Sequence, residues 1–254
     1  MSIAAPVALI THALAYVGPA ACAALSSAGY RLHADDAGFA DATRAAAWRA
    51  AHPGASTSAL TDPAAVVDAV ISAHGRIDVI VSNDAHPAVH GPILAGDVSA
   101  LRDTLAVLVE RPYRLMRAGA PYLVQQGAGS IVFITSCRTE LPLDGGAIPD
   151  MARAAANALV RSLAIELAPS GIPVNAIAPN FYASETYFPS ARFVENAAGR
   201  DYLQKVVPAG RLGQPAEITP LIGYLAALRT PFPTGAIIPF AGGWPAATPR
   251  PKLD

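Results

Sequence analysis

The sequence predicts a doubly wound α/β fold, in which a seven-stranded parallel sheet carries helices on both faces. Short apolar, β-branched runs alternate with longer stretches of helical periodicity along all 254 residues. Runs such as Val79-Ile80-Val81 are apolar at every position, as expected of strands that are buried on both faces. No break in composition separates one part of the chain from another, so residues 1–254 are expected to form a single domain.

The first half of the chain alternates three predicted strands with three predicted helices. The strands are expected at 7–10, 30–33 and 78–82, and the helices in the alanine-rich segment that ends near Gly29, at 39–51 and at 64–74. The strand residues are chiefly apolar and the helical segments are two to three times longer, which separates the two kinds of element.

The second half repeats this alternation. Helices are expected at 98–125, 149–167 and 215–228, and strands at 130–135, 174–178 and 236–240. In the helix at 149–167, leucines recur every fourth residue, Pro149 suits the first turn, and Gly171 stands just past the end. In such a fold, ligands bind at the carboxyl ends of the parallel strands.

Composition narrows the function classes. The chain is 52% apolar and 15% charged with a net charge of −1, which indicates a globular protein without the basic surface that nucleic acid or an anionic membrane would require. Two cysteines, Cys22 and Cys137, cannot build a disulfide framework, so a cytoplasmic location is expected. No basic residue precedes Arg31 and no apolar run is long enough to span a membrane, so neither a signal peptide nor membrane association is expected. Lys205 is the first lysine, which excludes lysine chemistry from residues 1–204.

Five sequence pieces, in this order and spacing, resemble the short-chain dehydrogenase/reductase superfamily over nearly the whole chain. They are Asp78–Asn83, Gly129–Ser136, Gly171–Pro179, Arg211 with Pro215 and Glu217, and Gly242-Gly243. The resemblance implies a Rossmann-like fold, which agrees with the fold class that the element pattern predicts.

The glycine-rich turn of that superfamily is altered in this chain. The superfamily pattern Thr-Gly-x3-Gly-x-Gly aligns with residues 11–18, where His12 and Tyr16 replace two of the three glycines. Glycines are needed at this turn so that the backbone can approach a pyrophosphate at a helix N-terminus. The sequence therefore predicts that no nicotinamide cofactor binds.

Residues 11–18, together with residues farther along the chain, resemble the halohydrin dehalogenases. These are cofactor-independent relatives that interconvert vicinal haloalcohols with epoxides and halide. Thr11, Tyr16 and Gly18 fit their N-terminal signature, Pro179-Asn180 replaces Pro-Gly, and Arg153 takes the place of the reductases' lysine. The resemblance implies that Ser136 binds the substrate oxygen and that Arg153 supports the base. It also implies a pocket that holds the substrate and the leaving anion. The residues expected to line this pocket are Tyr16, Asp84, His90, Pro179, Asn180, Phe181, Tyr182 and Tyr187.

The catalytic tyrosine of that family is replaced. The family pattern Ser-x12-Tyr-x3-Arg places Pro149 at the tyrosine position, and no tyrosine lies between Tyr122 and Tyr182. Without a phenol, ring closure lacks the base that removes the hydroxyl proton. The chain could still open epoxides with azide, cyanide or nitrite, because Ser136 can hydrogen-bond the epoxide oxygen.

Two residues, Asp150 and His90, are candidates for the missing base. Asp150 adjoins the vacated position, although a carboxylate in a first helical turn is also expected from the helix dipole. His90 and His86 are spaced by four residues in a loop, but Pro87 argues against the helix that a metal pair would need, so no metal site is expected. Cys137 is expected to pack as a small apolar side chain.

Three other functions remain open at this point. A different cofactor-free lyase or isomerase could use Asp150 or His90. A catalytically degenerate member could keep the fold as a binding protein, and a nicotinamide oxidoreductase would have to bind NAD or NADP despite the altered turn. The resemblance also implies a homotetramer, in agreement with small or apolar residues on more than one face of the helix at 149–167, such as Ala154, Ala155, Ala158 and Leu159.

Overall fold

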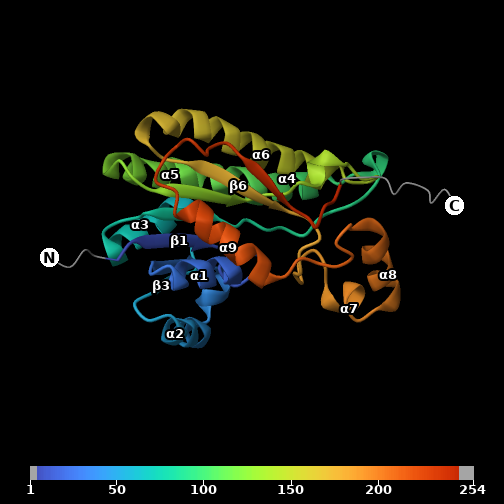
Figure 1. The fold of residues 1–254 in the computed structure, drawn as a ribbon, viewed down its shortest axis with the longest axis horizontal. Coiled ribbons are helices and arrows are strands. Elements are labelled where there is room, and N and C mark those ends of the chain that lie inside the picture. Colours follow the sequence, from blue (N-terminus) through green and yellow to red (C-terminus); the bar gives the residue numbers. More distant parts are fainter. Residues whose placement is uncertain (1–4, 246–254) are drawn as a thin grey trace.

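The computed structural model describes residues 5–245, and its seven strands form one parallel sheet in the order β3-β2-β1-β4-β5-β6-β7 (Figure 1). The strands are β1 (Val7–Thr11), β2 (Arg31–Asp35), β3 (Ser56–Ser58), β4 (Val79–Ser82), β5 (Ser130–Ile134), β6 (Val174–Pro179) and β7 (Ile237–Phe240). The strand order reverses between β1 and β4, which creates a crevice at the carboxyl ends of these strands. The predicted doubly wound fold is confirmed.

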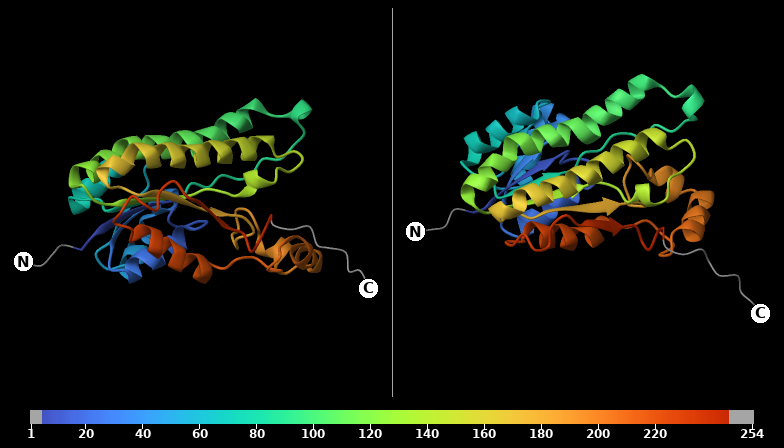
Figure 2. Two further views of the ribbon diagram at one scale, coloured as in Figure 1. Left: turned by 45° about the horizontal axis from the view of Figure 1, so that its top comes forward. Right: turned by 90° about the horizontal axis from the view of Figure 1, so that it is seen from above.

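Helices cover both faces of the sheet (Figure 2). They are α1 (Gly18–Ser27), α2 (Ala42–Ala51), α3 (Pro63–His74), α4 (Val98–Leu105), α5 (Arg111–Gln126), α6 (Ala147–Leu167), α7 (Ser190–Phe193), α8 (Ala197–Val206) and α9 (Pro215–Ala226). Alternate residues of β1 supply the two cores: Ala8 and Ile10 pack with α1 and α9, whereas Val7 and Leu9 pack with α3, α5 and α6. No helix within residues 5–245 is long and apolar enough to cross a membrane.

Some predicted boundaries were wrong. The helix predicted at 39–51 begins at Ala42, because the Asp41 carboxylate caps it by accepting from the amides of Thr43 and Arg44. The helix predicted at 149–167 begins two residues earlier, at Ala147. The helical stretch predicted at 98–125 is interrupted by a π-helical turn over Ala106–Glu110.

Three short elements were not located from the sequence. The edge strand β3 consists of Ser56, Thr57 and Ser58, so it lacks the apolar residues that mark the other strands. Helices α7 and α8 follow β6 and lie beyond its carboxyl end, at the end of the sheet where a ligand site is expected (Figure 1).

The carboxyl end of β4 is tied to the turn between β1 and α1. The Asn83 amide group donates to the carbonyls of His12 and Ala15, both at 3.0 Å, and its backbone N–H donates to Thr11 Oγ1 at 2.9 Å. Because Asn83 is fully buried, these bonds fix the turn against the sheet.

Candidate active site

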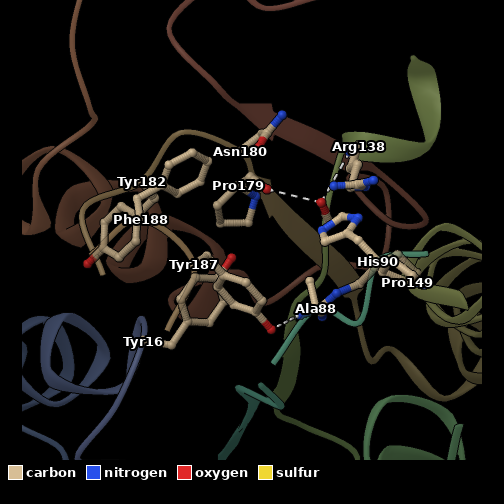
Figure 3. A pocket seen from close by; sticks show the side chains of 12 residues that line it. Tyr16, Ala88, His90, Arg138, Pro149, Pro179, Asn180, Tyr182, Tyr187 and Phe188 are labelled. Carbon is tan, nitrogen blue, oxygen red and sulfur yellow. Dashed lines mark hydrogen bonds between the residues drawn. The ribbon is translucent and has the colours of Figure 1, made fainter. Parts of the chain in front are cut away.

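A small cavity opens at the carboxyl ends of β5 and β6, beside the first turns of α6 (Figure 3). Its volume is about 110 Å³. It is lined by Tyr16, Ala88, His90, Ser136, Arg138, Pro149, Arg153, Pro179, Asn180, Tyr182, Tyr187 and Phe188. A space of this size suits a molecule of a few non-hydrogen atoms, since sites for drug-sized ligands are several times larger.

Ser136 presents its hydroxyl just past the end of β5. The Oγ atom donates to the Pro179 carbonyl at 3.2 Å and accepts from the Arg138 amide at 3.1 Å. The Asn157 side chain of α6 donates to the Ser136 carbonyl at 3.1 Å. Since the hydrogen bond to the Pro179 carbonyl is long and therefore weak, the hydroxyl loses little free energy when it turns to a ligand in the cavity.

Arg153 is a buried cation that reaches the cavity from α6. Its side chain donates through Nη2 to the Tyr187 hydroxyl at 2.8 Å and through Nη1 to the Asp84 carbonyl at 3.3 Å. No carboxylate among residues 5–245 forms an ion pair with it, although only 5% of the residue is exposed. A buried charge without a counter-charge favours the binding of an anion.

Arg153 makes no hydrogen bond to Ser136. Its guanidinium binds Tyr187 and the Asp84 backbone, and it lies 5.8 Å from the centre of the Tyr187 ring. Both residues nevertheless line the same cavity.

Aromatic side chains form the opposite wall. Tyr16 meets the edges of Tyr182 and Tyr187, with ring centres 5.8 Å and 5.0 Å apart. The Tyr187 hydroxyl donates to the His86 carbonyl at 2.9 Å and accepts from the His86 amide at 3.1 Å, so this phenol is held by the loop after β4. Burial raises the pKa of Tyr16, and it raises the pKa of Tyr182 to about 12, so both phenols stay neutral.

A second arginine, Arg138, lines the cavity and was not predicted from the sequence. Its Nε donates to the Asp150 carboxylate at 2.5 Å, and its side chain is only 16% exposed. Asp150 therefore acts as the counter-ion of Arg138 and is not itself part of the cavity lining. His90 does line the cavity, and its pKa is lowered by burial and then by the charge of Arg138.

Asp84 and Phe181 were predicted in the pocket, but their side chains lie outside its lining. The Asp84 carboxylate accepts from Ser82 Oγ at 2.5 Å and lies 3.5 Å from His12 Nδ1 and 3.7 Å from Arg111 Nε. Phe181 has a positive φ of 53° and packs on Trp244 and Phe188 in a separate apolar cluster. Tyr16, His90, Pro179, Asn180, Tyr182 and Tyr187 do meet at the cavity.

In the turn before α1, several backbone N–H groups already donate to acceptors of this chain. The amides of Ala13, Leu14, Ala15 and Gly18 donate to Asp35 O, Asp36 Oδ2, His12 O and Ala15 O at 2.9–3.2 Å. Gly18 is needed because a Cβ there would lie 2.2 Å from the His12 carbonyl. A bound pyrophosphate requires free amides and close approach of the backbone at this place. With four amides engaged and the large Tyr16 side chain in place of a glycine, the residues of this turn fit a dinucleotide poorly.

Comparison with known protein families gives a match over most of the chain. The family model described as Enoyl-(Acyl carrier protein) reductase matches residues 16–245. This chain belongs to the short-chain dehydrogenase/reductase superfamily. Among curated superfamily members, it is 34% identical to (2S)-[(R)-hydroxy(phenyl)methyl]succinyl-CoA dehydrogenase subunit BbsC of Thauera aromatica, with 93% of each chain covered. A tropinone reductase homologue of Arabidopsis thaliana is 30% identical, but the match covers only 66% of this chain and 64% of that relative.

Two solved superfamily structures carry names other than dehydrogenase or reductase. One is titled a dehalogenation enzyme, with 33% identity, a TM-score of 0.89, and 96% of this chain and 100% of that chain covered. The other is a halohydrin dehalogenase bound to ethyl (2S)-oxiran-2-ylacetate, with 31% identity, a TM-score of 0.91, and coverage of 96% and 99%. This superfamily member is thus similar both to oxidoreductases and to dehalogenases.

We predict that NAD and NADP do not bind this superfamily member. Four amides of the turn are already bonded, and Tyr16 stands where the superfamily pattern has a glycine. Calorimetric titration of the purified protein should show no saturable heat with either nucleotide, and micromolar binding of either one would overturn the prediction.

We also predict that the His12–Asp84 pair contributes stability that depends on pH. Burial lowers the pKa of His12, but the Asp84 carboxylate 3.5 Å from Nδ1 outweighs it, so the pKa is raised above its ordinary value of 6.5. The contribution is therefore complete below pH 6.5 and is lost as pH rises through the raised pKa. His12→Asn, which tolerates the positive φ, should lower the free energy of unfolding by up to about 1 kcal/mol in acid and by less in alkali. Urea denaturation of the parent and of His12→Asn, each measured in acid and in alkali, checks this. An equal loss of stability under the two conditions would contradict it.

Proposed function

We propose that this protein opens epoxides with small anions such as azide, cyanide or nitrite, and interconverts vicinal haloalcohols with epoxides and halide, without a nicotinamide cofactor. One observation carries the proposal. A single small cavity joins a hydroxyl just past the end of a strand, Ser136, to a buried guanidinium, Arg153, and to an aromatic ring of the altered turn, Tyr16. The guanidinium has no counter-ion within residues 5–245. The similarity to a halohydrin dehalogenase supports the same assignment.

In the opening direction, Ser136 would hydrogen-bond the epoxide oxygen. The small anion forms a bond to one ring carbon while the bond between that carbon and the oxygen breaks. The oxygen then carries a negative charge and takes a proton from solvent, which gives a substituted alcohol. The positive charge of Arg153 would stabilise the developing negative charge, because a charge on a buried side chain is weakly screened by water.

The attacking or leaving anion would lie on the aromatic side of the cavity. Tyr16 and Tyr182 line this region with their rings nearly perpendicular to each other, and the positively polarised edges of aromatic rings attract anions. Asn180 uses its Oδ1 to accept from the Phe181 amide at 3.1 Å. Its Nδ2 meets no acceptor among the described residues, so it can donate to an anion.

Ring closure of a haloalcohol needs a base, and the cavity offers no phenol at position 149. Asp150 is paired with Arg138, which disfavours it as a replacement. Epoxide opening by azide, cyanide or nitrite is therefore the reaction in which this chain should be most active, since Ser136 and Arg153 can assist the oxygen while solvent supplies the proton.

The test is an assay of the purified protein from which nicotinamide has been removed, with an epoxide and azide. We expect azide to be consumed and an azido alcohol to appear, and Ser136→Ala to slow this about 5- to 30-fold (about 1–2 kcal/mol for one hydrogen bond to the reacting oxygen). Absence of turnover with several small epoxides, at high protein concentration, would reject the proposal.

A further inference from the structure

The cavity has two chemically different sides (Figure 3). Tyr16, Tyr182, Tyr187 and Phe188 gather on one side, whereas Arg138, His90 and Pro149 lie together on the other. If the small anion lies on the aromatic side, the substituent of the epoxide must extend toward Arg138. The chemistry of that side therefore decides which substituent is accepted.

Arg138 is held in place beside the Ser136 hydroxyl, which would bind the reacting oxygen. Its backbone amide donates to Ser136 Oγ at 3.1 Å, and its Nε donates to Asp150 at 2.5 Å. Gly146 leaves room for this pair, because a Cβ at that position would lie 2.5 Å from Arg138 Nη2 and 2.6 Å from Asp150 Oδ2. A fixed guanidinium loses little freedom when it binds a ligand, which strengthens recognition.

Arg138 still has donors to offer. Among the described residues, Asp150 is the acceptor for Nε, Nη2 is enclosed beside Gly146 and the Asp150 carboxylate, and Nη1 meets no acceptor. A guanidinium has five N–H groups and can serve two carboxylates at once. The position of Arg138 in the lining therefore gives the cavity a charged donor group that Asp150 does not saturate.

The charges around the cavity also favour an anionic ligand. Arg138 and Arg153 both line it, and Asp150 is the one carboxylate that pairs with either of them within residues 5–245. One guanidinium charge is thus uncompensated. Pro149 fills less space on this side than an aromatic residue would, which leaves room for a short substituent.

We propose that Arg138 recognises a carboxylate on the substrate, so that the substrates of this protein are small epoxy acids and the corresponding hydroxy acids. The reaction in this inference rests on the proposed function, whereas the binding of a carboxylate does not. The cavity volume of about 110 Å³ limits the acid to a short chain.

The reaction test compares oxiran-2-ylacetate with its ethyl ester in the azide assay. The parent should prefer the acid in kcat/KM by about 10- to 100-fold, as expected for a charge-assisted hydrogen bond. Arg138→Met should abolish this preference, Arg138→Lys should keep part of it, and Arg44→Met, at an exposed arginine of α2, should leave it unchanged. Because Arg138→Met leaves Asp150 without its partner, the double variant Arg138→Met, Asp150→Asn is measured beside it.

A binding test separates this inference from the proposed function. The probes are 3-hydroxybutanoate and its ethyl ester, which resemble the opened substrate but cannot react. We expect calorimetric titration to show tighter binding of the acid, and loss of that difference in both variants that lack the arginine. Turnover of epoxides with no preference for acids, or acid binding that is unchanged in Arg138→Met, would overturn the inference. Binding that depends on Arg138 without any epoxide turnover would support the inference while rejecting the proposed reaction.

Discussion

Replacing Pro149 with tyrosine should raise the rate of haloalcohol ring closure by about 10²–10⁴-fold, the usual contribution of a general base. Pro149 is the third residue of α6 and lines the cavity, and Arg153 follows one helical turn later on the same face. A phenol at this position would therefore lie beside both Ser136 and Arg153. Since the first-turn N–H groups of a helix have no partner within the helix, the substitution should not disturb the backbone. Halide release, measured at neutral and alkaline pH, checks the prediction, and the gain should be largest in alkali.

Pro149→Phe is the matched control, because it adds the same ring without the hydroxyl. Opening by azide should gain less than ring closure if Ser136 alone assists the oxygen, whereas opening by halide must gain as much as closure because the equilibrium constant is unchanged. If Pro149→Tyr folds and binds azide yet closes haloalcohols no faster than Pro149→Phe, the cavity is not arranged for dehalogenation.

Removing the charge of Arg153 should lower kcat/KM for epoxide opening by about 10²–10³-fold, the range seen when one preorganised group that stabilises developing charge is lost. Arg153→Met keeps the length of the side chain and removes its uncompensated buried charge. The folded protein should tolerate this change, since replacing a buried charge by an apolar group of similar size is often neutral or stabilising. Steady-state kinetics and thermal unfolding, measured on the same samples, separate the effect on catalysis from the effect on stability.

Arg153→Lys is the control that keeps the charge but loses the planar fork that donates to Tyr187 and the Asp84 carbonyl. It should retain more activity than Arg153→Met. Equal activity of the parent and Arg153→Met would show that the charge has no part in the reaction.

The fold was predictable because most strands are buried on both faces. Val79, Ile80 and Val81 of β4 and Ile131, Val132 and Phe133 of β5 are apolar at successive positions, a local signal that needs no knowledge of the tertiary structure. By contrast, β3 is a polar edge strand held by pairing to β2. Its residues are strand-forming only in that context, so no periodicity marks them.

The candidate site was predictable where position along a strand or helix determines it. Ser136 lies two residues past the end of β5 and Arg153 lies in α6 at the same end of the sheet, so spacing alone brings both to the cavity. Asp84 also follows a strand, but Ser82 and His12 hold its carboxylate away from the cavity. The direction in which such a side chain points depends on hydrogen-bond and charge partners that lie far from it in the sequence. Arg138 was missed for the same reason, although its place two residues after Ser136 was a usable signal.

The central claim is that the cavity carries out anion chemistry on epoxides and not hydride transfer. The most direct measurement is one reaction that contains the parent protein, a small epoxide, azide, a small ketone and NADPH. We predict that azide is consumed and an azido alcohol forms while the absorbance of NADPH stays constant. Oxidation of NADPH with reduction of the ketone, while azide stays constant, would contradict the claim.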